Sequence, residues 1–333
     1  MNNVDIQYTN LLRDILDNGY PKDTRSGRVR SVFSRTMHFN LQDGIPLLTT
    51  KKVFYKGIIE ELLWFISGST NIKPLLENDV HIWDDDAYRY YKELVEKHNK
   101  IATTTNAHKF SEEVTYSTKV IFPKDSFLQK ALNGEKDNFL YSTYGYYREY
   151  TFGDLGNMYG KNWRRFGTSG IDQIQGVIDL LKNDPNSRRI LLTCYDPETV
   201  DDAALYPCHI MYQFYCKEIP FGLRLAKYCD TYSVPLNMPS ETELDVFDIP
   251  KYKLSCSFIC RSQDVPLGTP FNIASAAFLT YMLAEICNME PDELIWIGQD
   301  CHIYENKFEV VQELLTSNGN DIIIYCVGYL YGV

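Results

Sequence analysis

The sequence predicts a protein of strands and buried helices, of the α+β or α/β class. Two observations carry this prediction. Segments with apolar residues at helical spacing recur along the chain. Between them lie apolar or alternating runs that are typical of strands. The expected strands are 29–41, 188–195, 209–216, 253–262 and 293–304, and the expected helices are 4–18, 54–68, 71–78, 86–99, 171–185, 271–288 and a stretch around 305–316.

Several helix ends carry the residues that stop helices. Gly19 follows the first helical segment, Gly68 follows the second, and Pro185 closes the segment 171–185. The segment 54–68 is apolar on most faces, so we expect it to be buried.

The length of 333 residues allows one large domain or two ordinary ones. We expect a single domain over 1–333 with two insertions. They cover roughly 98–152, which is polar and rich in tyrosine, and 216–253, which contains four prolines. Neither stretch has a sustained period, so both should form loops and short elements.

Composition excludes several classes of function. Hydrophobic residues make up 44%, as in ordinary globular proteins. The net charge is −11 with no basic run, so a nucleic-acid partner is not expected. A small anionic substrate stays open, since a cleft can be locally basic. No run reaches the roughly 20 apolar residues of a membrane span, and the polar start does not resemble a signal peptide. We therefore expect a cytoplasmic protein without membrane contact.

The nine cysteines are scattered and odd in number. No CxxC pair occurs, and Cys256 and Cys260 form a CxxxC inside a predicted strand. This pattern suits a reducing compartment and predicts neither a disulfide framework nor a metal site.

Cys208 and His209 stand together at the head of an apolar run, in LYPCHIMYQFYC. Spacing alone favours a structural role, because free cysteine is among the most buried residue types. A nucleophile is the alternative.

Arginines stand out in three places: Arg25 in DTRSG, Arg188 and Arg189 in NSRRI, and Arg261 in CRSQD. Guanidinium groups match phosphate oxygens bidentately. Adjacent arginines are more often solvated surface, but Arg261 follows an apolar run where an unpartnered charge is costly. An anionic ligand is therefore most plausible at Arg261.

Other polar residues have two interpretations each. Glu61 is either solvated at a helix edge or a buried proton-transfer carboxylate with a raised pKa. His302 and Tyr304 share one face of an extended segment, either binding a sugar hydroxyl or as polar core groups. Asn272 near a helix start either caps the helix or reads an amide edge.

In order, these positions resemble the thymidylate synthase family over most of the chain outside the insertions. The resembling strings are RSG (25–27), PLLTTKKVFYKGIIEELLWFISGSTN (46–71), IWD (82–84), GDLGNMYGKNWR (153–164), IDQIQGVIDLLKNDPNSRRI (171–190), ALYPCHIMYQFY (204–215), RSQDVPLGTPFNIAS (261–275) and HIY (302–304). Such a resemblance implies a large mixed sheet flanked by helices, an α+β fold.

The resemblance also implies a reaction. A cysteine thiolate, here Cys208 with His209 beside it, adds to C6 of the uracil of dUMP and makes C5 nucleophilic. A thiol ionises more readily near guanidinium groups, and Arg261 is the candidate neighbour. The co-substrate is 5,10-methylenetetrahydrofolate, and no metal is needed.

Further roles follow from the same resemblance. Arg25 and Arg261, with a pair from the partner subunit of a homodimer, hold the phosphate. The remaining residues implied are Arg188 and Arg189 (the partner's phosphate), Ser262 and Asp264 (the nucleotide), Asn272 (the uracil edge), His302 and Tyr304 (the ribose), Glu61 and Tyr159 (water and protons), and Trp83 and Asp264 (the folate).

Two departures from the family pattern bear on the product. Cys260 stands where the family usually has glutamine, and 29 residues follow Tyr304 in this chain of 333, fewer than is usual in thymidylate synthases. We expect water to reach a methylene intermediate and give 5-hydroxymethyl-dUMP, as in the hydroxymethylases of bacterial viruses, which act in the host cytoplasm. The alternatives are a thymidylate synthase that makes dTMP and dihydrofolate, and a non-catalytic nucleotide-binding paralogue.

Overall fold

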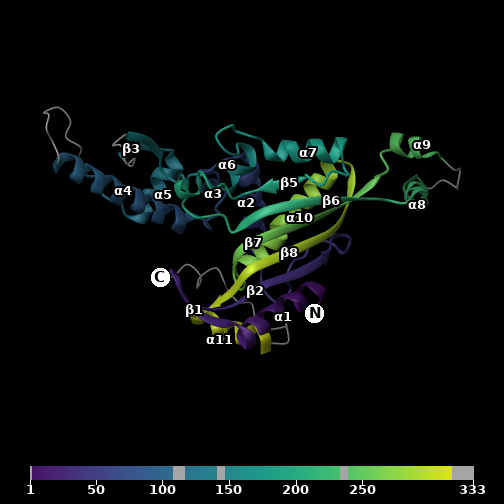
Figure 1. The fold of residues 1–333 in the computed structure, drawn as a ribbon, viewed down its shortest axis with the longest axis horizontal. Coiled ribbons are helices and arrows are strands. Elements are labelled where there is room, and N and C mark those ends of the chain that lie inside the picture. The colour runs from purple at the N-terminus through teal and green to yellow at the C-terminus, as the bar shows by residue number, and fades with distance from the viewer. Residues whose placement is uncertain (1, 108–116, 141–146, 233–238, 317–333) are drawn as a thin grey trace. The chain divides into compact units, whose positions relative to one another are not determined.

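A computed structural model describes residues 2–107, 117–140, 147–232 and 239–316 (Figure 1). The apolar run DIIIYCVGYLYGV (321–333), which ends the given sequence, lies outside these residues. The chain divides into two compact units. Unit 1 comprises 1–62, 172–194 and 208–333, and unit 2 comprises 63–171 and 195–207. The single domain expected from the sequence stays a prediction.

Unit 1 is built on a six-stranded sheet of order β1-β2-β8-β7-β6-β5. Its neighbours are antiparallel except β7 and β8, which are parallel. A crossover through α10 (Gly268–Ile286) joins that parallel pair. The mixed sheet flanked by helices confirms the predicted fold class. The strands are β1 (Tyr20–Thr24), β2 (Gly27–Asn40), β5 (Leu191–Thr193), β6 (His209–Glu218), β7 (Tyr252–Asp264) and β8 (Met289–Tyr304).

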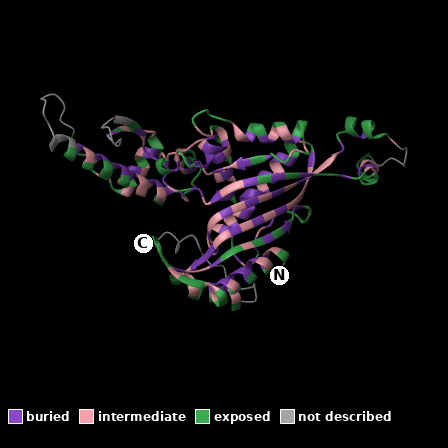
Figure 2. Ribbon diagram, viewed as in Figure 1, coloured by how far each residue is buried: buried purple, intermediate pink, exposed green. Residues whose placement is uncertain are grey.

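Strand register gives the sheet one buried face. A row of large side chains crosses five strands: Leu192, Tyr212, Phe258, Trp296 and Met37. All five are buried. Buried residues alternate with half-buried ones along β7 and largely with exposed ones along the second half of β6 (Figure 2). Because successive side chains point to opposite faces, this alternation fixes the register.

The next row lies on the other face and is apolar but open. It runs through Thr193, Met211, Ile259, Ile297 and Thr36. The three central members are half-buried and Thr36 is exposed. This face of the sheet is therefore only partly covered within one chain.

Helices flank the sheet of unit 1. Helix α10 contacts β7 and β8, and α1 contacts β2 and β8. The N-cap of α1 is Asn2, whose side chain accepts a hydrogen bond from the Asp5 backbone N–H at 2.8 Å. Gly19 ends this helix, where a Cβ would lie 2.2 Å from the Ile15 carbonyl oxygen. The other helices are α2 (Tyr55–Ser67, which continues into unit 2), α7 (Gln173–Asn183), α8 (Phe221–Tyr232), α9 (Glu241–Val246) and α11 (Phe308–Thr316), with α1 spanning Asn3–Asn18.

Unit 2 is organised around aromatic side chains. Tyr91 is buried, and its ring centroid lies 5.0 Å from that of Phe127 and 5.5 Å from that of Phe152. The stretch 98–152 was expected to hold only loops and short elements, yet α4 continues through its first residues. The elements of unit 2 are α3 (Lys73–Glu77), α4 (Asp84–Ala107), α5 (Lys124–Asn133), the hairpin β3 (Lys136–Leu140) with β4 (Tyr147–Thr151), and α6 (Tyr159–Arg164).

The stretch 216–253 is partly strand at both ends, because β6 continues to Glu218 and β7 begins at Tyr252. Between them, α8 is anchored by the buried guanidinium of Arg224, which donates to the carbonyl oxygens of Ile249 at 2.8 Å and Pro250 at 3.1 Å. Every helix and strand expected within the described residues is present, with shifted ends. None of the helices described here is long and apolar enough to cross a membrane.

Candidate active site

Cys208 lies directly before His209, the first residue of β6. The Arg261 backbone N–H donates to the Cys208 carbonyl oxygen at 2.8 Å, which ties the cysteine to β7. The register shifts between His209 and Met211, as in a β-bulge. Bulges re-aim side chains at strand ends. Cys208 is half-buried.

His209 lies opposite Cys260 and points into the protein. It is 7% exposed, and its Nδ1 lies 2.9 Å from the Tyr212 hydroxyl. Burial lowers the pKa of His209 to about 3. The imidazole is therefore neutral at physiological pH and cannot act as a cation beside Cys208.

Cys260 differs from Cys208 in its surroundings. It is fully buried, and burial raises the pKa of its thiol well above the usual range, with a smaller contribution from Cys208. It therefore stays a neutral thiol. Of this adjacent pair, Cys208 is the more accessible.

The ends of β7 and β8 bring further predicted residues together. Asp264 lies opposite His302, and the Val265 backbone N–H donates to the His302 carbonyl oxygen at 3.0 Å. The rings of His302 and Tyr304 lie edge to face, with centroids 5.3 Å apart. Their expected position on one face of the strand is confirmed.

The pKa of Tyr304 shows which residues lie near its hydroxyl. Burial raises its pKa, and the charges of Asp264 and Cys208 act in the same direction, whereas a hydrogen bond with Ser26 and the charge of Arg25 oppose them. The same environment thus includes the β1–β2 turn and the strand ends. Arg25, Cys208, Asp264 and Tyr304 form one neighbourhood within unit 1.

Asn272 lies in the second turn of α10, not at its cap. The N-cap position is Leu267, so the capping alternative is wrong. Instead the Asn272 Nδ2 donates to the Gln263 Oε1 at 3.2 Å. Asp264 has a local role too, because its Oδ1 accepts from the Leu267 backbone N–H at 3.3 Å. Ser262 is half-buried on β7 between Arg261 and Gln263.

Comparison with known proteins identifies the family of the chain. The thymidylate synthase family model matches residues 6–322. The chain belongs to the thymidylate synthase family. Members of the family are one-carbon transferases that use methylenetetrahydrofolate as co-substrate.

Individual relatives cover nearly the whole chain. A thymidylate synthase of Francisella tularensis subsp. holarctica is 36% identical over 324 residues, 93% of this chain and 84% of the relative. One of Francisella philomiragia is 34% identical over 330 residues, 95% of this chain and 86% of the relative. A bifunctional dihydrofolate reductase-thymidylate synthase of Zea mays is 35% identical over 319 residues, and the match spans 92% of this chain but only 45% of that longer protein.

The arginines that this family resemblance singles out lie at opposite edges of the sheet. Arg25 is exposed in the turn between β1 and β2, at one edge. Arg188 and Arg189 are exposed just before β5, at the other edge. The Phe214 backbone N–H donates to the Ile190 carbonyl oxygen at 3.0 Å. Since Phe214 is six residues from Cys208 along β6, the Arg189 backbone lies about 20 Å from Cys208 at roughly 3.3 Å per residue.

Glu61, Trp83 and Tyr159 complete the set of predicted site residues. Glu61 is half-buried on α2, as is Glu60, so neither faces fully into solvent. Trp83 and Tyr159 belong to unit 2, where they are 8% and 3% exposed. Their ring centroids are 6.5 Å apart. Both rings pack on Phe65, at 6.5 Å from Trp83 and 4.8 Å from Tyr159.

Sequence analysis missed two residues that support the site. Asp300 accepts from the Ser31 hydroxyl at 2.8 Å and pairs with Lys22, and its backbone oxygen lies 3.2 Å from the His302 Nδ1. Burial opposes ionisation of Asp300, but the bonds from Lys22 and Ser31 outweigh it and hold the pKa of the carboxyl below its usual value. The second is Gln263, the partner of Asn272. Gln263 lies between the predicted residues Ser262 and Asp264 on β7, and Asp300 lies two residues before His302 on β8, which was the available signal.

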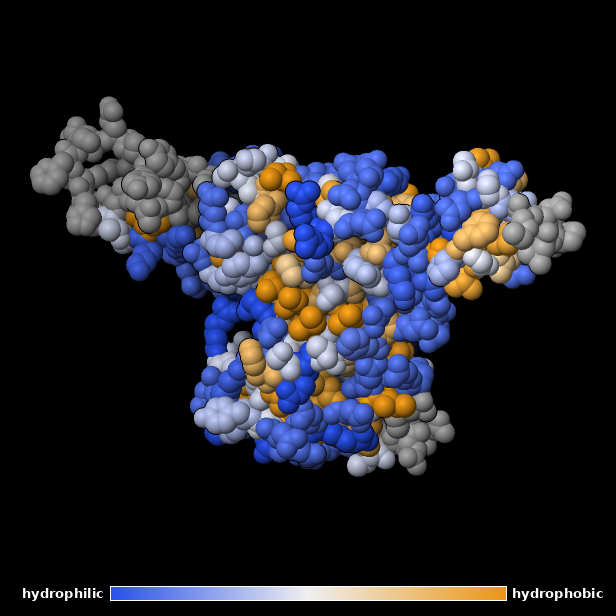
Figure 3. Space-filling model, turned by 45° about the vertical axis from the view of Figure 1, so that its right-hand side comes forward, coloured by the Kyte–Doolittle hydropathy of each residue, from blue (hydrophilic) through white to orange (hydrophobic). Residues whose placement is uncertain are grey.

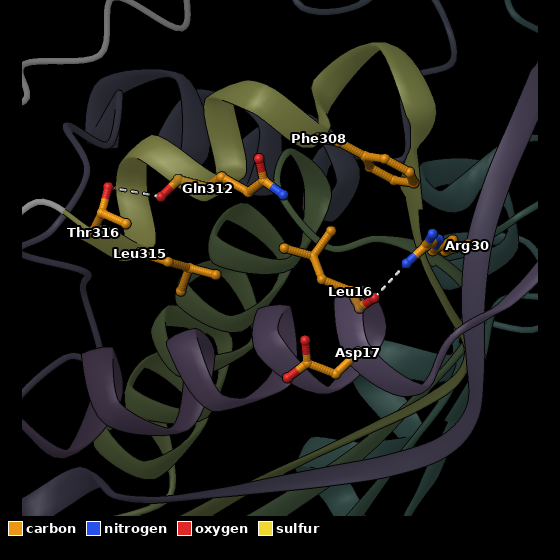
Figure 4. A pocket seen from close by; sticks show the side chains of 7 residues that line it. All are labelled: Leu16, Asp17, Arg30, Phe308, Gln312, Leu315 and Thr316. Carbon is orange, nitrogen blue, oxygen red and sulfur yellow. Dashed lines mark hydrogen bonds between the residues drawn. The ribbon is translucent and has the colours of Figure 1, made fainter.

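A cavity of about 340 Å³ lies elsewhere in unit 1, between α1 and α11 (Figure 4). Arg30 spans it, donating to the Leu16 carbonyl oxygen at 2.5 Å with its guanidinium carbon 5.4 Å from the Phe308 ring centroid. No predicted site residue lines it. Among the described residues, no cluster of His, Cys, Asp and Glu could hold a metal ion.

Proposed function

We propose that this protein transfers a one-carbon unit from methylenetetrahydrofolate to C5 of dUMP through a covalent adduct with Cys208. The observation that carries the proposal is the position of Cys208, which is half-buried directly before β6. Its carbonyl oxygen accepts a hydrogen bond from the Arg261 backbone N–H. Its thiol and the Arg25 guanidinium both act on the pKa of Tyr304. Family membership supports the reaction type. The substrates are cytoplasmic metabolites, so the reaction takes place in the cytoplasm.

Each residue then has a chemical task. The Cys208 thiolate adds to C6 of the uracil, and electron density passes to C5, which attacks the methylene carbon of the folate as the bond from that carbon to N10 breaks. The C5 proton leaves next, and Glu61 and Tyr159 order the water that carries protons. When the product forms, the Cys208–C6 bond breaks and the thiolate returns. The neutral imidazole of His209 positions the strand end through its contact with the Tyr212 hydroxyl and is not the proton carrier.

We assign the binding roles from the resemblance to the family. Asn272 faces the base, His302 and Tyr304 hold the ribose 3′-hydroxyl, and Ser262 binds beside Arg261. The same resemblance assigns Trp83 and Asp264 to the folate. Arg25 and Arg261 hold the phosphate, since forked guanidinium donors match its oxygens.

We further propose a homodimer in which Arg188 and Arg189 bind the phosphate in the partner's site. Two observations support it. The Arg189 backbone is about 20 Å from Cys208 of the same chain by strand spacing, beyond the reach of an arginine side chain. The open face of the sheet, with half-buried Met211, Ile259 and Ile297, also needs a cover. Apolar side chains reach the surface near the centre of Figure 3.

Loss of the C5 proton breaks the bond between the methylene carbon and N5 of the folate, and it leaves an exocyclic methylene on the nucleotide beside tetrahydrofolate. Two products can form from this intermediate. Hydride transfer from the folate gives dTMP and dihydrofolate, and the relatives named thymidylate synthase support this outcome. Water addition gives 5-hydroxymethyl-dUMP, the product expected from the sequence. The observation that favours it is Cys260, a buried thiol beside the site where the family usually has glutamine. We rank dTMP first, because a buried thiol alone does not admit water.

Product analysis decides between them. The protein is incubated with dUMP and methylenetetrahydrofolate, the nucleotide is analysed by mass spectrometry, and dihydrofolate is followed by its absorbance. Stoichiometric dTMP and dihydrofolate support thymidylate synthase, and the hydroxymethyl nucleotide without dihydrofolate supports hydroxymethylation. No turnover by a protein that binds dUMP would instead indicate the non-catalytic paralogue.

A further inference from the structure

Gln263 is a buried amide beside the base-reading residue. It lies on β7, two residues after Arg261, and is only 2% exposed. Its Oε1 accepts the hydrogen bond from the Asn272 Nδ2 at 3.2 Å. Of the two residues, Asn272 is the half-buried one and Gln263 lies behind its amide.

Gly268 makes room for this amide. A Cβ at that position, the first residue of α10, would lie 2.7 Å from the Gln263 Nε2 and 3.9 Å from the Asn272 Nδ2. The first distance is shorter than carbon atoms tolerate. Glycine therefore leaves the space that the carboxamide of Gln263 occupies, and the three residues pack as one group.

We propose that Gln263 is a positioning residue that fixes the orientation of the Asn272 amide and so makes the site select uracil over cytosine. The inference rests on the proposed function, in which Asn272 faces the base. Uracil presents an acceptor at O4 and a donor at N3, whereas cytosine presents a donor at its 4-amino group and an acceptor at N3. An asparagine amide turned by half a revolution exchanges its donor and acceptor and suits the other base.

The hydrogen bond decides between the two orientations. With one Nδ2 hydrogen on Gln263, the second hydrogen and Oδ1 of Asn272 remain for O4 and N3–H of uracil. Turning Asn272 alone would set its Oδ1 against the Gln263 Oε1, so two acceptors would meet and a buried bond would be lost. Turning both amides would restore the bond but requires Gln263 to rotate in the narrow space beside Gly268.

The test compares two substitutions of similar size. Gln263→Met removes the acceptor. The dissociation constant for dCMP divided by that for dUMP should then fall about tenfold, the change expected from the loss of one buried hydrogen bond. Gln263→Glu keeps an acceptor toward Nδ2 and should retain the wild-type ratio. Both constants are measured by titration calorimetry, with kcat/KM for dUMP alongside.

A matched control is Gln173→Met. The Gln173 Nε2 donates to the Thr193 carbonyl oxygen at 2.8 Å on another part of the sheet, so this variant should change stability but not the nucleotide ratio. If Gln263→Met does not fold by circular dichroism, Gln263→Ala carries the same expectation.

The failures are distinguishable. A wild-type protein that does not bind dUMP would refute the proposed function itself. A wild-type protein that binds dUMP selectively, with the ratio unchanged in Gln263→Met, would refute only the role of Gln263. Equal losses in the Met and Glu variants would also overturn it, because packing rather than the acceptor would then set selectivity.

Discussion

The two units hold their predicted functional residues in different ways. In unit 1, Cys208, Arg261, Asn272 and Tyr304 are half-buried and are placed by strand register and by single hydrogen bonds. In unit 2, the predicted residues Trp83 and Tyr159 are buried among rings.

The difference teaches where mutations should act. Residues at strand ends contribute few packing contacts, so replacing them should change chemistry or binding more than stability. Residues of the aromatic cluster around Phe65 contribute buried area, so replacing them should first lower the free energy of unfolding. Four experiments test this contrast, from the largest expected effect to the smallest.

Cys208→Ser should lower kcat by about four orders of magnitude, because serine is far less ionised than cysteine at neutral pH. The dUMP dissociation constant should stay within about threefold, since the phosphate and base contacts remain. Steady-state kinetics and calorimetry measure the two. Cys229→Ser, on α8, is the matched control and should keep wild-type activity; near-normal turnover by Cys208→Ser would refute the nucleophile.

Phe65→Ala should lower the free energy of unfolding by about 3–5 kcal/mol, since it empties a buried ring position against the rings of Trp83, Tyr159 and Trp163. Denaturant unfolding measures the change. The control is Leu63→Ala on the same helix, where the side chain is 46% exposed, and its cost should stay below about 1 kcal/mol. Equal costs for the two variants would mean that the aromatic cluster does not stabilise unit 2.

Arg189→Ala should raise KM for dUMP about 30-fold, the worth of a charge-assisted hydrogen bond to phosphate. If the arginine acts in the partner's site, mixing Arg189→Ala with Cys208→Ser subunits should restore one intact site per heterodimer. Arg13→Ala on α1, an exposed arginine, should leave KM unchanged. Failure of the mixture to recover activity, with subunit exchange verified, would count against the shared site.

His209 predicts a pH effect on stability. Its pKa is about 3 in the folded protein and about 6.5 when unfolded, so the unfolded chain binds more protons below neutrality. The stability it contributes is fully present above pH 6.5 and is lost as pH falls toward 3. Between pH 7 and 5 the wild type should lose about 2 kcal/mol more than His209→Gln, measured by urea unfolding. Identical losses would show that the imidazole is not buried.

Much of the fold could be predicted because periodicity and stop signals agree with the final elements. The alternation of 29–41 gave β2, and the apolar run 209–216 gave β6. The helix α4 extends to Ala107, well beyond the predicted 86–99. The prediction stopped too early because the second half of the helix carries threonines and polar residues without a clear period. The helix contacts β3, and the ring centroid of His98 lies 6.2 Å from that of Phe139, so tertiary packing supports α4 where propensity alone is weak.

The site could be predicted only in part. The resemblance identified residues by type, but a hydrogen bond between Gln263 and Asn272, or between Asp300 and Ser31, depends on which side chains meet across strands. The buried, neutral state of His209 also depends on the register shift that follows it. Sequence spacing carries no information on either.

The pairing of β2 with β8 has a consequence for biosynthesis. Val29 lies opposite Tyr304, so the sheet joins residues 275 positions apart. As the ribosome releases the chain from its N-terminus, β2 emerges long before its partner and waits with one unpaired edge. Such edges invite association with other chains. Closing so long a loop is also slow, so we expect refolding to be limited by formation of this pair and to benefit from dilution.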